Sequence, residues 1–140
     1  MKTSEFIAKY ATYMREGEIK NRATCSSVFY DGGKIYSYGW HYPLLYPIQS
    51  DKGTTLLCVN RRGYSVTTSK HIGWAGVHAD IAVESSSVIA NTGEIAAQIT
   101  HEIEIDQAKY DALKRKNTQK AAIILADIER RKGYMLKLQS

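Results

Sequence analysis

The chain contains only two cysteines and two prolines among its 140 residues, and it has no long apolar run. Cys25 and Cys58 have no C-x-x-C spacing, so they predict neither a disulfide framework nor a structural zinc site, and we expect reduced thiols within strands. The longest apolar stretches, such as AAIILA at residues 121–126, are much shorter than the roughly 20 residues that span a bilayer. The N-terminus carries a charge every few residues instead of a signal-peptide core. These absences predict a cytoplasmic protein that is not inserted in a membrane.

The composition is otherwise that of an ordinary folded domain. Hydrophobic residues make up 44% of the chain and charged residues 24%, which argues against a disordered or fibrous protein. The length predicts one domain over residues 1–140, with a hydrophobic core of its own. The net charge of +5 favours an anionic partner such as nucleic acid only weakly, because many basic proteins bind none.

The first half of the chain changes from a helical to a strand-like periodicity. Residues 3–17 repeat apolar side chains every three or four positions, which predicts an amphipathic helix with Thr3 or Ser4 as its cap. Residues 25–69 alternate with period two and are rich in β-branched and aromatic side chains, and the DGG turn supplies the positive φ angles of a hairpin. We therefore predict four antiparallel strands in a meander. The second strand should lie at an edge or bend near Pro43, because proline donates no ladder hydrogen bond.

The next segment has weaker signals. Ser69 is the expected N-cap of a helix over residues 70–82, although Gly73 and Gly76 lie within it and each costs about 1 kcal/mol relative to alanine. Residues 93–99 fit either a strand or a helix. The predicted architecture is a curved antiparallel sheet, a four-strand meander plus one or two further strands, with helices at its ends.

The last third of the sequence predicts one more strand and a long helix. Isoleucines alternate with polar residues over 99–105, which favours a strand there. Asp106 is then placed to cap a helix over residues 107–132, about 39 Å long at 1.5 Å per residue. A helix of that length is expected to overhang the domain and to pair with a second copy. With the N-terminal helix and the sheet, this gives an α+β fold.

Aromatic residues are concentrated in KIYSYGWHYPLLYPI, residues 34–48. If this segment is extended, Tyr36, Tyr38, Trp40 and Tyr42 project from one face. Such a row suits the stacking of single-stranded bases, at about 1–3 kcal/mol per base, with nearby cations meeting the phosphates. The same alternation is also the ordinary mark of a half-buried strand that packs beneath helices. The sequence leaves both interpretations open.

The hydroxyls and bases near residue 70 are the strongest hint of chemistry. Ser69, Lys70 and His71 are consecutive, but no G-x-S-x-G or S-x-x-K motif accompanies them, so no catalytic residue is assigned. A hydrolase or nuclease that uses His71, with Ser69 or His41, remains an alternative, and so does phosphate binding at a helix N-terminus with help from Lys70 and Arg62. The histidines lack the spacing of metal ligands, and we predict neither a metal nor a cofactor.

Two short motifs carry a resemblance to a known family. With YSYG at residues 36–39 and YSVTTSKH at residues 64–71, the chain resembles a family of small uncharacterised domains found in bacteriophages, plasmids and archaeal viruses. The resemblance covers roughly residues 27–80. The family has no established activity, so the resemblance implies a mobile-element setting and supplies no catalytic residues. By analogy of setting, it implies a protein that blocks a host machine, as anti-CRISPR and other anti-defence inhibitors do.

We therefore expect a non-enzymatic binding protein whose target is nucleic acid or a host nucleoprotein complex. The expected surface combines aromatic side chains for contact with cations for phosphate: Tyr38, Trp40, His41, Tyr42, Arg61, Arg62, Ser69, Lys70 and His71. The alternatives are the hydrolase or nuclease and a dimeric structural protein that associates through its last helix.

Overall fold

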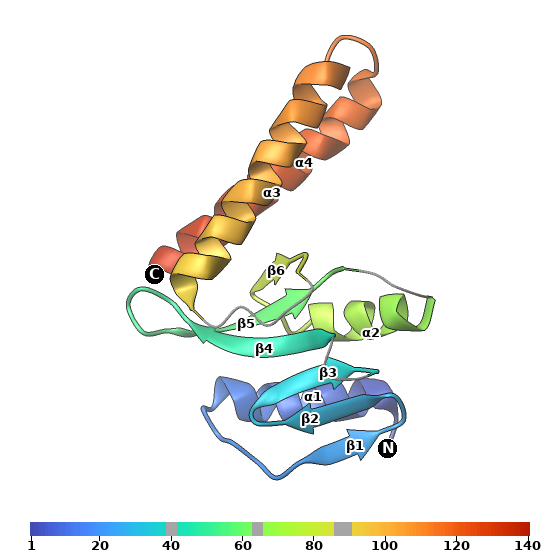
Figure 1. Ribbon diagram of the computed structural model, residues 1–140, viewed down its shortest axis with the longest axis vertical. Coiled ribbons are helices and arrows are strands. Elements are labelled where there is room, and N and C mark those ends of the chain that lie inside the picture. Colours follow the sequence, from blue (N-terminus) through green and yellow to red (C-terminus); the bar gives the residue numbers. More distant parts are fainter. Residues whose placement is uncertain (39–41, 63–65, 86–90) are drawn as a thin grey trace.

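The structure, a computed structural model, describes residues 1–38, 42–62, 66–85 and 91–140. Within these residues the chain forms four helices and one six-stranded sheet, and the α+β class with an N-terminal and a long C-terminal helix is confirmed (Figure 1). None of the helices described is long and apolar enough to cross a bilayer.

Helix α1 (Thr3–Arg15) forms where the sequence predicts it, because one side of it is apolar. Its N-cap position is occupied by Lys2, whose backbone N–H lies 3.4 Å from a carboxylate oxygen of Glu5, so the prediction of Thr3 or Ser4 as the cap is wrong. The chain leaves the helix through Gly17, at a φ of 72° that glycine adopts without strain.

The sheet is a meander followed by one parallel strand. Its strands are β1 (Ala23–Cys25), β2 (Val28–Asp31), β3 (Lys34–Ser37), β4 (Pro43–Gln49), β5 (Thr55–Asn60) and β6 (Ile81–Val83), in that spatial order. The pairs from β1–β2 to β4–β5 are antiparallel, and the last pair, β5–β6, is parallel. Gly32 and Gly33 have φ of 59° and 85°, which confirms the hairpin turn between β2 and β3.

The aromatic segment forms two strands instead of one long second strand. β3 ends at Ser37, Tyr38 takes a φ of 66°, and the chain re-enters the sheet at Pro43. Of the two alternatives predicted for this segment, the edge strand is wrong, because β4 lies between β3 and β5, whereas the irregular pairing of β3 with β4 beside Pro43 agrees with the bend. Pro43 is tolerated there because it is the first residue of the strand and lies beside an irregularity in the pairing with β3.

The segment after β5 is a helix where a strand was predicted. Helix α2 (Val66–Gly76) contains Ser69, so neither the strand that was to end there nor the cap at Ser69 is correct, and the helix does not extend to residue 82. Residues 81–83 form β6 instead. Just before it, the Asp80 carboxylate accepts a hydrogen bond from the Leu57 backbone N–H, 2.8 Å away, which holds β6 beside β5.

The C-terminal third is a helical hairpin of α3 (Thr92–Leu113) and α4 (Thr118–Gln139). The predicted strand over 99–105 is therefore wrong, and the open question at 93–99 is answered in favour of a helix. Asp106 lies inside α3, and the predicted helix over 107–132 is broken by a turn. Asn91 caps α3 and Asn117 caps α4, each through its side-chain oxygen.

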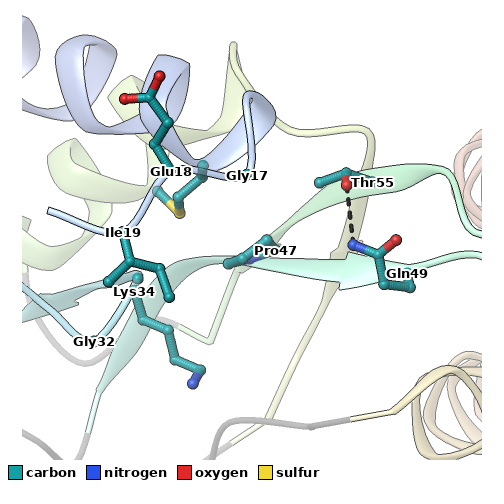
Figure 2. Close-up of a pocket in the computed structure, with 10 residues that line it drawn as sticks. Gly17, Glu18, Ile19, Gly32, Lys34, Pro47, Gln49 and Thr55 are labelled. Carbon is teal, nitrogen blue, oxygen red and sulfur yellow. Dashed lines mark hydrogen bonds between the residues drawn. The ribbon is translucent and has the colours of Figure 1, made fainter.

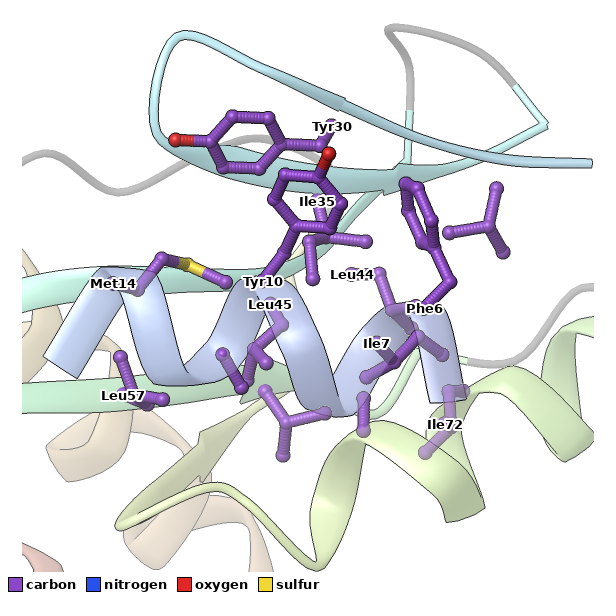
Figure 3. Close-up of a cluster of buried hydrophobic side chains, with 14 of the residues drawn as sticks. Phe6, Ile7, Tyr10, Met14, Tyr30, Ile35, Leu44, Leu45, Leu57 and Ile72 are labelled. Atoms are coloured by element: carbon purple, nitrogen blue, oxygen red, sulfur yellow. The ribbon is translucent and has the colours of Figure 1, made fainter. Parts of the chain in front are cut away.

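Two apolar cores lie on opposite faces of the sheet. In the first, α1 and α2 cover one face, and the ring of Tyr10 stacks on that of Tyr30 with centroids 4.3 Å apart (Figure 3). In the second, Tyr46 and Ile81 of the sheet meet Ile95 and Leu138 at the base of the helical hairpin. The outer part of the hairpin extends away from the sheet (Figure 1).

Candidate nucleic-acid interface

Helix α2 lies at the surface beside the end of β3, and its two sides differ. Ala75, Ile72 and His71 are buried against the sheet, whereas Lys70 and Trp74 are exposed. This division follows from the helical spacing of the apolar residues in the sequence VTTSKHIGWAG. The helix therefore presents a cation and a large aromatic ring to solvent.

A buried hydrogen bond fixes α2 to the sheet. The Nδ1 atom of His71 lies 2.7 Å from the hydroxyl oxygen of Ser37, the last residue of β3. Burial lowers the pKa of His71 below its usual value of 6.5, so its imidazole is neutral at physiological pH. A neutral ring keeps one nitrogen as an acceptor and one as a donor, which suits a hydroxyl partner.

The imidazole of His71 contacts two aromatic rings that reach the surface. The ring centroids of Tyr38 and Trp74 are each 5.8 Å from that of His71. Tyr38 is 60% exposed and Trp74 is 39% exposed. Tyr38 holds its outward position at a left-handed φ, and its backbone N–H donates to the Ser27 carbonyl over 2.7 Å. We call Tyr38, His71 and Trp74 the aromatic row.

Cations border α2 at the exit of β5. The backbone N–H of Arg61 donates to Val83, and that of Arg62 donates to the side-chain oxygen of Asn60. Asn60 is fully buried and also bonds Ser85, so it fixes the backbone from which both arginine side chains emerge. Both arginines are exposed, as is Lys70.

Along the other side of α2 runs a hollow of about 390 Å³. Arg61 borders it together with Ser69 and Val77, and Gly73 and Gly76 leave its floor without side chains. No atom lies within 4 Å of the place where a Cβ on either glycine would stand, so packing does not require glycine there. The hollow therefore lies on one side of α2 and the aromatic row on the other, with the exposed Lys70 between them.

Most of the residues predicted from the sequence as a binding surface lie close together in the structure, and one of them, Tyr42, does not reach that surface. Tyr38, Arg61, Ser69, Lys70 and His71 all lie on or beside α2, and Arg62 follows directly. Tyr42 is buried, and its hydroxyl donates to the Asn60 carbonyl, so it supports the arginine segment instead of contacting a ligand. Trp40 and His41 lie outside the described residues.

Trp74 was not among the contact residues predicted from the sequence, and neither Ser37 nor Asn60 was predicted as a support. Trp74 was detectable, because a helix through His71 places a residue three positions later on the same side. The partners of Ser37 and Asn60 are distant in sequence, at His71 and Ser85, and no local pattern indicates them.

The geometry around His71 bears on the hydrolase alternative. Its hydrogen-bond partner is Ser37, which is 0% exposed, so that hydroxyl is closed to a substrate. Ser69 is exposed, but it borders the hollow on the other side of the helix. Among the residues described, no three His, Cys, Asp or Glu side chains gather as a metal site would require.

A second hollow, of about 210 Å³, lies between the end of α1, the β2–β3 turn and β4 (Figure 2). Ile19 and Pro47 line it, and the amide of Gln49 donates to the Thr55 hydroxyl over 2.9 Å. Lys34 is the one cation that borders it among the described lining residues. This hollow has neither exposed aromatic rings nor a cluster of cations, so it is the weaker candidate for an anionic polymer.

Comparison of the chain with protein-family models, with curated proteins and with solved structures finds no match in any of the three.

Proposed function

We propose that this chain is a non-enzymatic binding protein that engages nucleic acid, or a host nucleoprotein complex, through the surface around α2. The observation that carries the proposal is the pair of exposed rings, Tyr38 and Trp74, which both contact the ring of His71 and have cations close by. The contact surface consists of Tyr38, Arg61, Arg62, Ser69, Lys70 and Trp74, and His71 is buried beneath it as a support for the two rings. Single-stranded nucleic acid is the form that this chemistry fits best.

Stacking and phosphate contact supply distinct parts of the binding energy. A base stacked on an aromatic side chain contributes about 1–3 kcal/mol whatever its identity, so the two exposed rings favour binding without sequence preference. Arg61, Arg62 and Lys70 are exposed cations that we expect to meet the phosphates. Three such contacts predict a slope of about −2 when the logarithm of the single-strand association constant is plotted against that of the salt concentration.

The test is binding of labelled single- and double-stranded oligonucleotides by the wild-type chain across a salt series. We expect tighter binding to single strands, and a loss of at least about fivefold in Trp74→Ala because one stacking platform is removed. Lys70→Ala should reduce the salt slope, whereas Lys52→Ala, an exposed lysine in the β4–β5 turn, should leave it unchanged. Absence of binding at low salt would overturn the nucleic-acid form of the proposal.

The resemblance to domains of mobile elements supports an inhibitory role. A phage or plasmid protein that acts in the host cytoplasm and masks a nucleic-acid site would block a defence complex such as a CRISPR effector. The corresponding experiment measures plasmid or phage interference in cells that carry an active CRISPR system and express the chain. Loss of interference with wild type and its restoration with Trp74→Ala would support the role. Unchanged interference with wild type would count against it.

Self-association is a second candidate property. Ile105 on α3 and Ile123 on α4 are exposed on the helical hairpin, where a globular monomer ordinarily carries polar side chains. This observation favours the homodimer through the last helix that the sequence predicts. Sedimentation of the full chain over a range of concentrations tests it directly.

A further inference from the structure

The outer half of the α3–α4 hairpin has an apolar character that its own two helices do not bury. The first turn of α4 is followed by the apolar stretch at residues 121–126, in which Ala121 is buried but Ile123 remains 66% exposed. On α3, Ile105 is 41% exposed. A helical segment that is apolar on all sides is normally enclosed by other elements, yet this one lies in the part of the hairpin that extends away from the sheet (Figure 1).

The exposed isoleucines lie on one flank of the hairpin. The residues of α4 that face α3 recur at alternating intervals of three and four, from Ala121 through Ile128 to Leu138. Ile99 and Glu102 mark the corresponding seam on α3. Each residue of a helix is rotated by about 100° from the one before it. Measured from the buried positions of α3 and α4, this rotation places Ile105 and Ile123 on the same side of the two antiparallel helices.

Charge is distributed unevenly along this hairpin. The part of α3 nearest the sheet, residues 92–105, contains three glutamates and no lysine or arginine, although Glu102 is buried beside Arg131. Residues 127–139 of α4, which lie at the same end, contain four cations and two carboxylates, so the two helices together are close to neutral there. The turn at the far end contains Lys114, Arg115 and Lys116 in succession. The first turn of α3 carries Glu94, and helical spacing from the seam puts Glu94 on the same flank as Ile105.

We infer that a second copy of this chain docks on this flank in antiparallel orientation, with Ile105 near the two-fold axis. The inference rests on the self-association proposed above and adds its geometry. An axis that crosses the hairpin lays α3 of one copy along α3 of the other. Glu94 and Lys116 are equally distant in sequence from Ile105, so each would face the other in the partner copy.

Charge decides between the two orientations. A parallel arrangement would set the two basic turns side by side, and like charges at an interface are unfavourable. The antiparallel arrangement sets each basic turn against Glu94 and the nearly neutral end of the hairpin in the other copy. The apolar flanks then meet in the middle as the core of a four-helix assembly.

Analytical ultracentrifugation of the full chain tests the flank. Wild type should sediment as a dimer, and Ile123→Glu should raise the dissociation constant about tenfold or more, because a carboxylate would be buried at the contact. Leu136→Glu is the matched control, since Leu136 is 68% exposed on the same helix but lies on the opposite flank, nearer the sheet. The Leu136→Glu variant should have the same dissociation constant as wild type. Equal dissociation constants for wild type and Ile123→Glu, with retained helical circular dichroism, would overturn the inference.

A charge exchange tests the orientation. Lys116→Glu should weaken the dimer, and adding Glu94→Lys to the same chain should restore it, because the pair is exchanged at both ends of a two-fold interface. A dimer that is weakened by Lys116→Glu but not rescued by Glu94→Lys would overturn the antiparallel arrangement and leave self-association standing. A chain that remains monomeric at every concentration would overturn both.

Discussion

The Nδ1 atom of His71 lies 2.7 Å from the hydroxyl oxygen of Ser37, and this contact joins the last residue of β3 to the middle of α2. Both side chains are buried. The imidazole also contacts the two exposed rings, those of Tyr38 and Trp74. A buried polar contact therefore positions the aromatic row, and its removal should affect both stability and binding.

Ser37→Ala should destabilise the fold. The substitution removes the hydroxyl and leaves Nδ1 of His71 buried without its partner, which costs about 1–3 kcal/mol of unfolding free energy. Urea denaturation monitored by circular dichroism measures this. Thr100→Ala, at an exposed position of α3, is the control and should change the unfolding free energy by no more than about 0.5 kcal/mol. Equal stabilities of the two variants would contradict a stabilising role for the hydrogen bond between Ser37 and His71.

The stability contributed by His71 should depend on pH. Burial lowers the pKa of its imidazole, so the folded state binds the proton less tightly than the unfolded chain does. This contribution is fully present above the unfolded value of about 6.5 and is lost as the pH falls toward the folded-state pKa. The unfolding free energy of wild type should therefore fall relative to that of His71→Gln between about pH 7.5 and pH 5.

The comparison with His71→Gln isolates this one group. The pKa of His78 is lowered by burial and by Arg15, but His78 is present in both proteins, so its effect cancels. Burial raises the pKa of Glu102, which acts in the opposite direction and also cancels. A free-energy difference that does not vary with pH would argue against a neutral, buried His71.

Tyr38→Asn should separate folding from binding. Tyr38 has a φ of 66°, a conformation that asparagine adopts more readily than tyrosine does, and its side chain is mostly exposed. We expect the unfolding free energy to be unchanged or higher by up to about 1 kcal/mol. Affinity for single-stranded oligonucleotides should fall by at least about fivefold with the loss of the ring. If affinity is unaffected, Tyr38 is not a contact residue.

Gly73→Ala should stabilise the protein and impair binding. A Cβ at this position meets no atom within 4 Å, so alanine should raise the unfolding free energy by about 1 kcal/mol through helix propensity. The added methyl group projects into the hollow beside Arg61 and should hinder a backbone that approaches α2. Gly133→Ala on α4 is matched, because its Cβ is also unobstructed, and it should stabilise without any change in affinity.

Local patterns predicted the N-terminal helix and the first hairpin because the contacts that decide them are local. α1 has an apolar side at helical spacing, and the β2–β3 turn contains two glycines with positive φ.

Prediction from local periodicity was wrong for residues 99–105. The alternation of isoleucine and polar residues there coincides with a helix in which Ile99 and Glu102 are both buried against α4. No local pattern indicates that Glu102 is buried, because its partner Arg131 is far away in the sequence.

Sequence analysis located the candidate interface through composition but not through geometry. The YSVTTSKH segment led to Lys70 and His71, and the cations after β5 were evident. The aromatic row of the structure is a different one, since Tyr42 is buried and Trp74 replaces it as an exposed ring. The left-handed turn at Tyr38 caused this difference, because it ends the alternation on which the predicted row depended.

The charged group inside the hairpin gives the last prediction. The Arg131 guanidinium pairs with the Asp106 carboxylate and lies 3.6 Å from Oε1 of Glu102, and all three side chains are largely enclosed. Arg131→Met should therefore cost about 3–5 kcal/mol of unfolding free energy, because two carboxylates lose their counter-ion.

This cost should depend on pH. Burial already raises the pKa of Glu102 although Arg131 acts to lower it, so removal of Arg131 makes protonation of Glu102 easier still. The loss of unfolding free energy in Arg131→Met should therefore be smaller at pH 5 than at about pH 8. Arg130→Met, which removes an exposed pair with Asp127 and a contact with the ring of Tyr134, should cost about 1 kcal/mol or less. Urea denaturation of both variants at the two pH values checks this, and equal losses for Arg130 and Arg131 would show that the enclosed cluster contributes no more than a surface ion pair.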